Sequence, residues 1–409
     1  MAVIEAAASK LTEQLHEARA ESDRFFGILK PEALYERPIA ERHRVIFYVG
    51  HLEGFDAIRI CREALGVPSP DSELDALFQA GIDPDSGHLP SDTSADWPSL
   101  EQVKGYVRRC RRRVDECLER APEDVAWMAL EHRQMHLETL AYMFHNFGYE
   151  SKTQPGHEQS SSQRDTAPPN DWREIPGGEA VLGKARDGAF GWDNEYEEMR
   201  VLVPAFRMQR YSVSNGDYLQ FVKEGATQPH FWTERNGAIF YRGMFEEIPL
   251  PLDWPVYVTQ KQAEAYATWL GKDLPTEEQF HRAAYGTPAG KTRPYPWGNV
   301  EPTPNRGNFD FRRWNPEAVD ATPDGDSAFG ISQLVGNGWE WTRTPFGPLP
   351  GFRPHEIYPG YSANFFDDEH YVIKGGSSRT AARLLRSSFR NWFRRDYAYV
   401  YATFRCVEN

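Results

Sequence analysis

The polar segment SKTQPGHEQSSSQRDTAPPNDW, residues 151–172, separates two stretches of the chain that differ in residue periodicity. Before it, apolar residues recur every three or four positions, which is typical of amphipathic helices. After it, Gly, Pro, Trp and Tyr are dense, and short runs such as HYVIKGG alternate with turn residues, which indicates strands joined by loops. We therefore predict an α+β protein with two domains, residues 1–150 and 173–409, and a linker over residues 151–172.

Four stretches of the first half carry the helical pattern. They read ASKLTEQLHEARAESDRFFGIL, HRVIFYVGHLEGFDAIRICREAL, SLEQVKGYVRRCRRRVDECLERA and LEHRQMHLETLAYMFH. Four helices of this kind favour an antiparallel four-helix bundle. Residues 66–98, between the second and third stretches, are rich in Pro, Asp and Ser and contain no arginine. A connection of that length usually forms a functional loop or a lid.

The composition excludes several classes of function. A formal net charge of -14 disfavours binding to nucleic acid or to an anionic membrane surface. No apolar run approaches the roughly 20 residues that cross a bilayer, and the acidic, amphipathic N-terminus is unlike a signal peptide. The four cysteines have no C-x-x-C spacing, and we expect them to be reduced thiols. These features predict a cytoplasmic protein with neither membrane nor nucleic-acid partners.

Two histidines in the fourth helical stretch have the spacing of metal ligands. His132 and His136 lie four residues apart and therefore project from one face of a helix, whereas His145 does not. Two neutral imidazoles on one face can bind a single zinc, copper, nickel or iron ion and leave room for ligands from another element. The spacing alone equally fits a solvated helix face that carries two histidines.

Seven segments of the second half form an ordered series: IPGGEAVLG, FRMQRYSVSNGDYLQFV, VTQKQAEAYATWLGKDLPTEEQFHRAAYG, YPWGN, FGISQLVGNGWEWT, VIKGGSS and FRCV. The series resembles the formylglycine-generating-enzyme and sulfatase-modifying family, whose fold is of the C-type-lectin kind. The first half resembles the DinB-like metal-binding bundles. The fusion of the two resembles the ergothioneine sulfoxide synthase group with its ovothiol and selenoneine relatives, which are non-haem iron enzymes that use O2.

The resemblance implies a three-histidine iron site. YVGHLEGFD supplies His51 on the second predicted helix, and HRQMHLE supplies His132 and His136 on the fourth. Three nitrogen ligands leave three positions of an octahedral Fe(II) open for substrate and O2. Glu138 lies about 200° around the helix from His136, so we expect it outside the ligand set, and we interpret His43 and His145 as ordinary surface or packing residues.

The resemblance also implies a pocket for hercynine, the trimethylated form of histidine. FRNWF supplies Asn391 and Trp392, and IYPGYS supplies Tyr361, and these three would hold hercynine. Tyr358 would act catalytically, delivering a proton during oxygen reduction. Many relatives have a glutamine beside the second helix histidine, and that glutamine contacts the hercynine imidazole. Met135 occupies this position here, so the contact would be missing or would come from Gln134.

Two departures from the family pattern bear on the sulfur or selenium donor. Phe393 follows RNW where synthases that use γ-glutamylcysteine commonly have aspartate, and the loop 66–98 lacks their paired arginines. A dicarboxylate donor would find no bidentate partner in that loop, although six arginines of the C-terminal segment lie outside it. We therefore expect a donor other than γ-glutamylcysteine, and we rank a neutral selenosugar slightly above free cysteine.

Two other functions fit parts of the pattern. A lectin-like domain fused to a bundle is also consistent with a non-catalytic ligand-binding or sensor protein. A formylglycine-generating oxidase, which resembles a copper enzyme with a cysteine pair near the C-terminus, is a weaker alternative, because Cys406 stands alone in this half of the chain.

Overall fold

The structure is a computed structural model that describes residues 2–79, 89–154 and 164–409. It divides into two compact units, Met1–His157 and Glu158–Asn409, and the predicted α+β class with two domains is confirmed. Of the predicted linker, residues 155–163 lie outside the described residues, as do residues 80–88 of the predicted loop. On either side of the linker gap, Lys152 forms a β-bridge with Leu29 and Trp172 begins the first strand.

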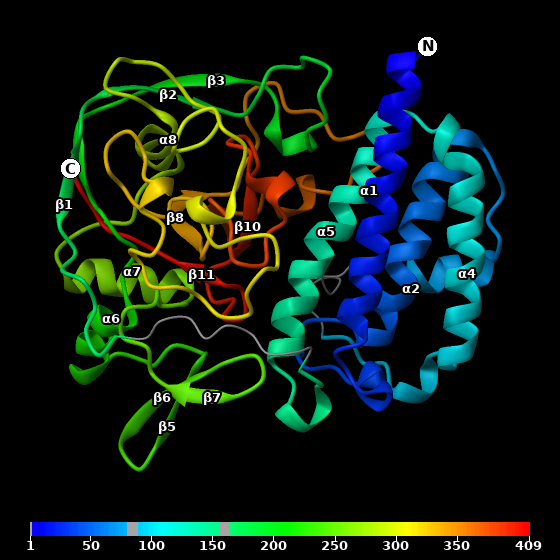
Figure 1. The fold of residues 1–409 in the computed structure, drawn as a ribbon, viewed down its shortest axis with the longest axis horizontal. Coiled ribbons are helices and arrows are strands. Elements are labelled where there is room, and N and C mark those ends of the chain that lie inside the picture. The colour runs from blue at the N-terminus through cyan, green and yellow to red at the C-terminus, as the bar shows by residue number, and fades with distance from the viewer. Residues whose placement is uncertain (1, 80–88, 155–163) are drawn as a thin grey trace. The chain divides into compact units, whose positions relative to one another are not determined.

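The first unit is built around the long helices α1, α2, α4 and α5, which are labelled in Figure 1. Helix α1 packs on α5, and α2 packs on both α4 and α5, as in a four-helix bundle. The long helices are α1 (Ala2–Phe26), α2 (Val45–Asp56), α4 (Leu100–Cys117) and α5 (Glu123–His145). Shorter elements are α3 (Ser72–Phe78) and the 3-10 turns η1 (Pro31–Tyr35), η4 (Ser94–Asp96), η5 (Leu118–Arg120) and η6 (Tyr149–Ser151).

Local sequence explains where these helices begin and how deep they lie. Helix α4 starts at a capping box, in which Ser99 and Gln102 satisfy each other's backbone amides. Helix α3, which the sequence reading did not predict, starts where Asp71 accepts a bond from the backbone N–H of Leu74. Helix α2 is buried on nearly every side and continues directly into the π-helix η2 (Ala57–Glu63). Its mainly apolar sequence therefore places it at the centre of the bundle.

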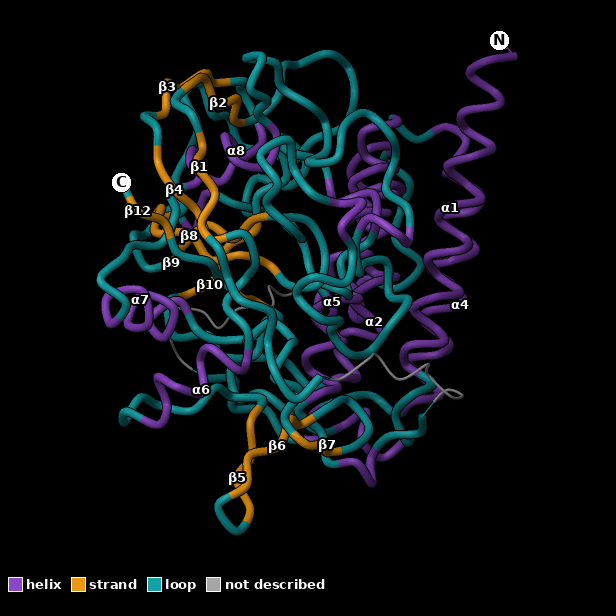
Figure 2. Tube along the Cα trace, turned by 60° about the vertical axis from the view of Figure 1, so that its left-hand side comes forward, coloured by secondary structure: helices purple, strands orange, loops and turns teal. Residues whose placement is uncertain are grey.

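The second unit is mostly loop with short strands (Figure 2). Its sheets have the orders β1-β4-β12, β10-β9-β8-β11, β2-β3 and β5-β6-β7. The strands are β1 (Trp172–Ile175), β2 (Gly178–Leu182), β3 (Met199–Val203), β4 (Phe206–Gln209), β5 (Trp232–Arg235), β6 (Ala238–Arg242), β7 (Glu247–Pro249), β8 (Trp339–Pro345), β9 (His370–Lys374), β10 (Asn391–Arg394), β11 (Ala402–Thr403) and β12 (Val407–Glu408). The helices are α6 (Asn215–Lys223), α7 (Gln260–Trp269) and α8 (Glu277–Tyr285).

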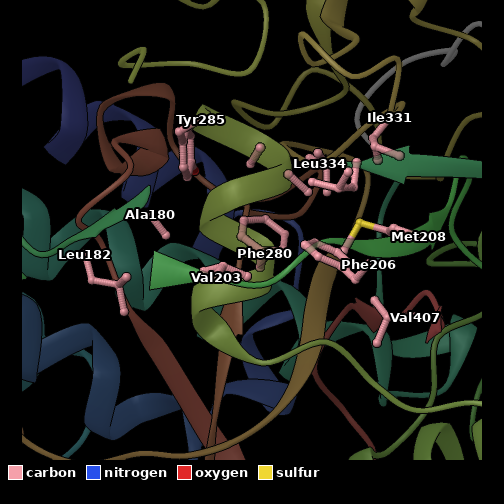
Figure 3. Close-up of a cluster of buried hydrophobic side chains, with 13 residues drawn as sticks. Ala180, Leu182, Val203, Phe206, Met208, Phe280, Tyr285, Ile331, Leu334 and Val407 are labelled. Carbon is pink, nitrogen blue, oxygen red and sulfur yellow. The ribbon is translucent and has the colours of Figure 1, made fainter. Parts of the chain in front are cut away.

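A cluster of buried apolar side chains holds this unit together (Figure 3). Helix α8 contributes Phe280 and Tyr285, which pack with side chains of β2, β3, β4 and β12. The loop before β8 adds Leu334, and its backbone carbonyl lies where a Cβ on Gly375 would be only 2.3 Å away. With a φ of +96° as well, position 375 admits only glycine. The core thus fixes the turn that follows β9 and leads toward β10.

No helix in the described part of the chain is long and apolar enough to cross a membrane.

Candidate active site

Three histidine side chains of the bundle converge on one point. His51 comes from α2, and His132 and His136 come from α5 (helices labelled in Figure 1). The Nε2 atom of His136 lies 3.2 Å from that of His51 and 3.0 Å from that of His132. Each histidine is at most 5% exposed, so the solvated helix face that the spacing also allowed is excluded. Three buried acceptor nitrogens facing one another leave a gap that a cation fits.

Neighbouring groups fix the orientation of these rings. The Nδ1 of His51 lies 2.7 Å from the carbonyl oxygen of Phe78, to which it donates, so its Nε2 lone pair faces the centre of the triad. The Phe47 ring stacks on His51 at 4.7 Å, and the Phe55 ring stacks on His132 at 3.5 Å with an interplanar angle of 9°. The imidazoles are therefore held in place by packing from α2 and by one carbonyl of α3.

Burial keeps the three imidazoles neutral. Desolvation lowers the pKa of His51 to about 4 and that of His132 and His136 well below the ordinary value. Neutral imidazole is the form that binds metal. Among the described residues, no carboxylate or thiolate joins the triad. A set of three neutral nitrogens suits Fe(II), Zn(II) or Cu(II), and in six-coordinate geometry it leaves three positions for other ligands.

A buried ion network lies beside the triad and joins α2 to α5. Arg133, the neighbour of His132, is fully buried and donates to Glu53 at 2.9 Å and to Asp56 at 2.6 Å. Burial alone would raise the pKa of Glu53, but Arg133, Arg111 and Arg19 lower it to about 2. Glu53 therefore stays ionised, and its bond to Arg133 ties α2 to α5, the two helices that carry the histidine triad. The sequence did not predict this network, because its residues come from four helices, α1, α2, α4 and α5, whose contacts residue spacing does not show.

The second unit brings the predicted catalytic residue, Tyr358, together with two predicted substrate-binding residues, Tyr361 and Trp392. The rings of Tyr361 and Trp392 lie 5.4 Å apart in an edge-to-face arrangement, and those of Tyr358 and Tyr361 lie 5.9 Å apart. All three side chains are partly exposed. Trp392 is supported from behind by Phe346, whose ring stacks on it at 4.1 Å. We call Tyr358, Tyr361 and Trp392 the aromatic cluster; such a cluster offers ring faces to a cation.

Strand geometry separates Phe393 from the aromatic cluster. Side chains alternate along β10, so Asn391 and Phe393 share the face opposite to Trp392. Phe393 stacks on Tyr397 at 5.0 Å instead. The side-chain oxygen of Asn391 accepts a bond from the backbone N–H of Trp392 at 2.9 Å. The contact of Asn391 with hercynine stays a prediction.

Gln134 does not share the helix face of His132 and His136. It lies two positions from both His132 and His136 on α5, so its side chain leaves the helix on the other side. Its contact with a hercynine imidazole stays a prediction. His145 and Glu138, which we expected outside the ligand set, are buried on α5 and are not part of the triad.

Comparison with known proteins gives a match to each unit. Residues 158–409 match the sulfatase-modifying factor enzyme 1-like domain, and residues 14–140 match the DinB superfamily. The chain is 34% identical to a protein of Mycolicibacterium thermoresistibile named hercynine oxygenase, over 78% of this chain and 76% of the relative. It is 40% identical to the Mycobacterium tuberculosis protein of that name, over 52% of this chain and 55% of the relative.

Fungal relatives match over more of this chain. The protein named ergothioneine biosynthesis protein 1 in Neurospora crassa is 28% identical over 93% of this chain and 56% of its own length. The chain therefore spans about half the length of several of the curated relatives it matches. Both domain families, in the predicted order, and the similarity to hercynine oxygenases over most of the length of both chains show that this protein belongs to the ergothioneine sulfoxide synthase family.

Proposed function

We propose that the protein is a non-haem Fe(II) enzyme that uses O2 to join sulfur or selenium to C2 of the hercynine imidazole. In the reaction, one atom of O2 enters the product as a sulfoxide or selenoxide. The other oxygen atom becomes water, whose two hydrogens come from C2 of the imidazole and from the thiol or selenol. The observation that carries the proposal is the buried triad of His51, His132 and His136, in a family whose relatives are named hercynine oxygenases.

The triad is proposed to hold the iron. Bound there, Fe(II) would supply reducing electrons and open coordination positions. The protein's own contribution is to keep His51, His132 and His136 neutral and oriented, through burial, the Phe78 carbonyl and the stacked Phe55 ring.

The aromatic cluster is proposed to hold hercynine. A quaternary ammonium group makes no conventional hydrogen bonds, so its binding depends on aromatic faces and on nearby negative charge. Tyr361 and Trp392 offer such faces. Asn391 is assigned to the same site from its family motif alone, because its side chain leaves the other face of β10. We assign to Tyr358 the delivery of a proton during oxygen reduction, because a phenol can donate a hydrogen and carries no charge near neutral pH.

The donor is proposed to be something other than γ-glutamylcysteine. The loop 66–98 has no arginine, and two of its aspartates already have partners: Asp71 pairs with Arg109 at 2.7 Å, and Asp75 accepts from the hydroxyl of Tyr106 at 2.7 Å. Phe393, in place of an acid, offers nothing to a donor ammonium group. Each buried and unpaired donor charge would cost about 2 to 5 kcal/mol. We therefore rank a neutral selenosugar slightly ahead of cysteine.

A competition assay tests the function and the donor together. Protein loaded with Fe(II) is given hercynine, O2 and equal amounts of γ-glutamylcysteine, cysteine and a selenosugar, and the products are analysed by mass spectrometry. We expect a selenium adduct, or failing that a cysteine adduct. A dominant γ-glutamylcysteine adduct would refute the donor assignment alone. Hercynine binding with no donor-dependent oxygen consumption would favour a ligand sensor over an enzyme.

A further inference from the structure

The short segment Trp192–Glu195 connects to the aromatic cluster through consecutive contacts. The ring of Trp192 stacks on Tyr361 at 4.0 Å, with an interplanar angle of 23°. The next residue, Asp193, accepts a 2.6 Å hydrogen bond from the hydroxyl of Ser362, which follows Tyr361 in the chain. Residues 193–195 form the 3-10 turn η7. Trp192 and Asp193, which are adjacent in the chain, therefore contact Tyr361 and Ser362, which are also adjacent.

The same turn also contacts the segment that carries Trp392. Arg386 and Ser388 donate to the Glu195 carboxylate at 2.8 and 2.6 Å. The guanidinium of Arg390 donates to the carbonyl oxygen of Asn194 at 3.4 Å, and Arg390 stands two residues before Trp392. Turn η7 thus joins the two segments on which Tyr361 and Trp392 lie.

Two buried acids of η7 differ in how their charge is compensated. Glu195 is fully buried and is paired with Arg386, so its charge is balanced. Asp193 is 3% exposed, and within the part of the chain that the structure describes no lysine or arginine makes an ion pair with it. Its Oδ2 atom has no hydrogen-bond partner. Burial raises the pKa of Asp193, and the Ser362 hydroxyl, the backbone amides of His355 and Asn194 and the charge of a protonated His355 offset this only in part.

The side-chain amide of Asn194, the next residue, also has buried polar atoms without hydrogen-bond partners. Asn194 is fully buried, and neither its side-chain oxygen nor its side-chain nitrogen has a hydrogen-bond partner. Native proteins pair the great majority of buried polar atoms, because an unpaired one costs about 1–3 kcal/mol. Three such atoms on two consecutive residues indicate a place where a ligand or an ordered water completes the structure.

We propose that Asp193 is a specificity-determining residue, whose carboxylate provides the counter-charge for the quaternary ammonium group held by Tyr361 and Trp392. The assignment rests on the proposed function, which makes hercynine the ligand. The aromatic rings contact the methyl groups of the ligand, and the Asp193 carboxylate adds a negative charge. This charge would favour a cation over an apolar group of the same shape. A buried carboxylate that makes no ion pair with a lysine or arginine is stabilised when a cationic ligand arrives.

Calorimetry with two matched ligands tests this proposal. The first ligand is hercynine, and the second is its neutral analogue with a tert-butyl group in place of trimethylammonium. Both are titrated anaerobically into the Fe(II) protein. Asp193→Asn keeps the shape and the Ser362 hydrogen bond but removes the charge. It should raise the Kd of hercynine at least about tenfold and leave the Kd of the neutral analogue within about twofold.

Ser362→Ala is the matched control, because it removes the hydrogen bond to Asp193 and retains the charge. We expect it to preserve the preference for hercynine over the neutral analogue. If Asp193→Asn weakens both ligands equally, or neither, Asp193 is structural and the proposal is wrong. If the wild-type protein fails to bind hercynine, the proposed function fails, and tetramethylammonium then replaces hercynine as the probe. Binding of tetramethylammonium that Asp193→Asn abolishes would uphold the cation site, and binding that the variant leaves unchanged would overturn it.

Discussion

The ring nitrogen Nδ1 of His51 and the backbone carbonyl of Phe78 lie 2.7 Å apart, which ties a candidate metal ligand to α3, a short helix within the loop 66–98. The carbonyl selects the tautomer of His51 that presents Nε2 to the triad. The position of α3 therefore bears directly on metal affinity. The loop that bears on the choice of donor therefore also orients His51, the candidate metal ligand.

Gly50→Ala should weaken metal binding through this link. A Cβ at position 50 would lie 2.5 Å from the ring of Phe78, so Phe78 must move and its carbonyl with it. We expect Fe(II) affinity to fall by about 10- to 100-fold, the usual effect of losing an outer partner of a ligating histidine. The control is Gly105→Ala on α4, where the nearest atom is 3.4 Å away on a flexible arginine. Equal affinities in the two variants, measured by anaerobic titration, would contradict the link.

Each histidine of the triad should be required for stoichiometric iron. Alanine at position 51, 132 or 136 leaves two imidazoles, too few to hold Fe(II) against buffer and chelator. We expect anaerobically purified variants to contain less than about a tenth of the wild-type iron by elemental analysis. His16→Ala is the control, because His16 is largely exposed and lies in an ion pair with Asp115. An unchanged iron content in His132→Ala or His136→Ala would remove the assignment.

The metal-free protein should lose stability on acidification. The pKa of His51 is about 4 in the folded state and about 6.5 when unfolded, so between these values only the unfolded state binds the proton. The contribution of His51 is therefore fully present above pH 6.5 and is lost as pH falls toward 4. From pH 7 to pH 5 the free energy of unfolding should drop by about 2 kcal/mol for His51 alone. Urea unfolding of apo wild type and His51→Gln measures it, and an equal pH slope in both would refute the cause.

The sequence predicted that His51, His132 and His136 come together, but not what surrounds them. Helical spacing places His132 and His136 on one face, and the resemblance supplied His51 from another helix. The Phe78 carbonyl could not be predicted, because any backbone carbonyl looks alike in a sequence. Nor could Asp193, since its significance lies in the ion pair that it lacks while Glu195 has one. Such features depend on contacts between residues far apart in the chain.

Trp392→Ala should weaken hercynine binding. A cation over a desolvated indole is worth on the order of 2 kcal/mol, which corresponds to a rise in Kd of roughly 30-fold. The control is Phe393→Ala on the same strand, because alternation puts Phe393 on the opposite face, against Tyr397. We expect that variant to bind hercynine nearly as wild type does. Undiminished calorimetric binding by Trp392→Ala would count against the aromatic cluster as the hercynine site.

Tyr358→Phe should separate binding from chemistry. The ring of Tyr358 lies 5.9 Å from that of Tyr361, and phenylalanine preserves this aromatic contact while removing the hydroxyl. The Kd of hercynine should therefore stay within about twofold of the wild-type value, whereas loss of a general acid lowers turnover by about 10²–10⁴-fold. If oxygen is still reduced without that proton, the thiol or selenol donor should be oxidised in place of forming the C–S or C–Se bond. The measurement is the ratio of adduct to oxidised donor per O2 consumed. A normal ratio at a normal rate would show that another group supplies the proton.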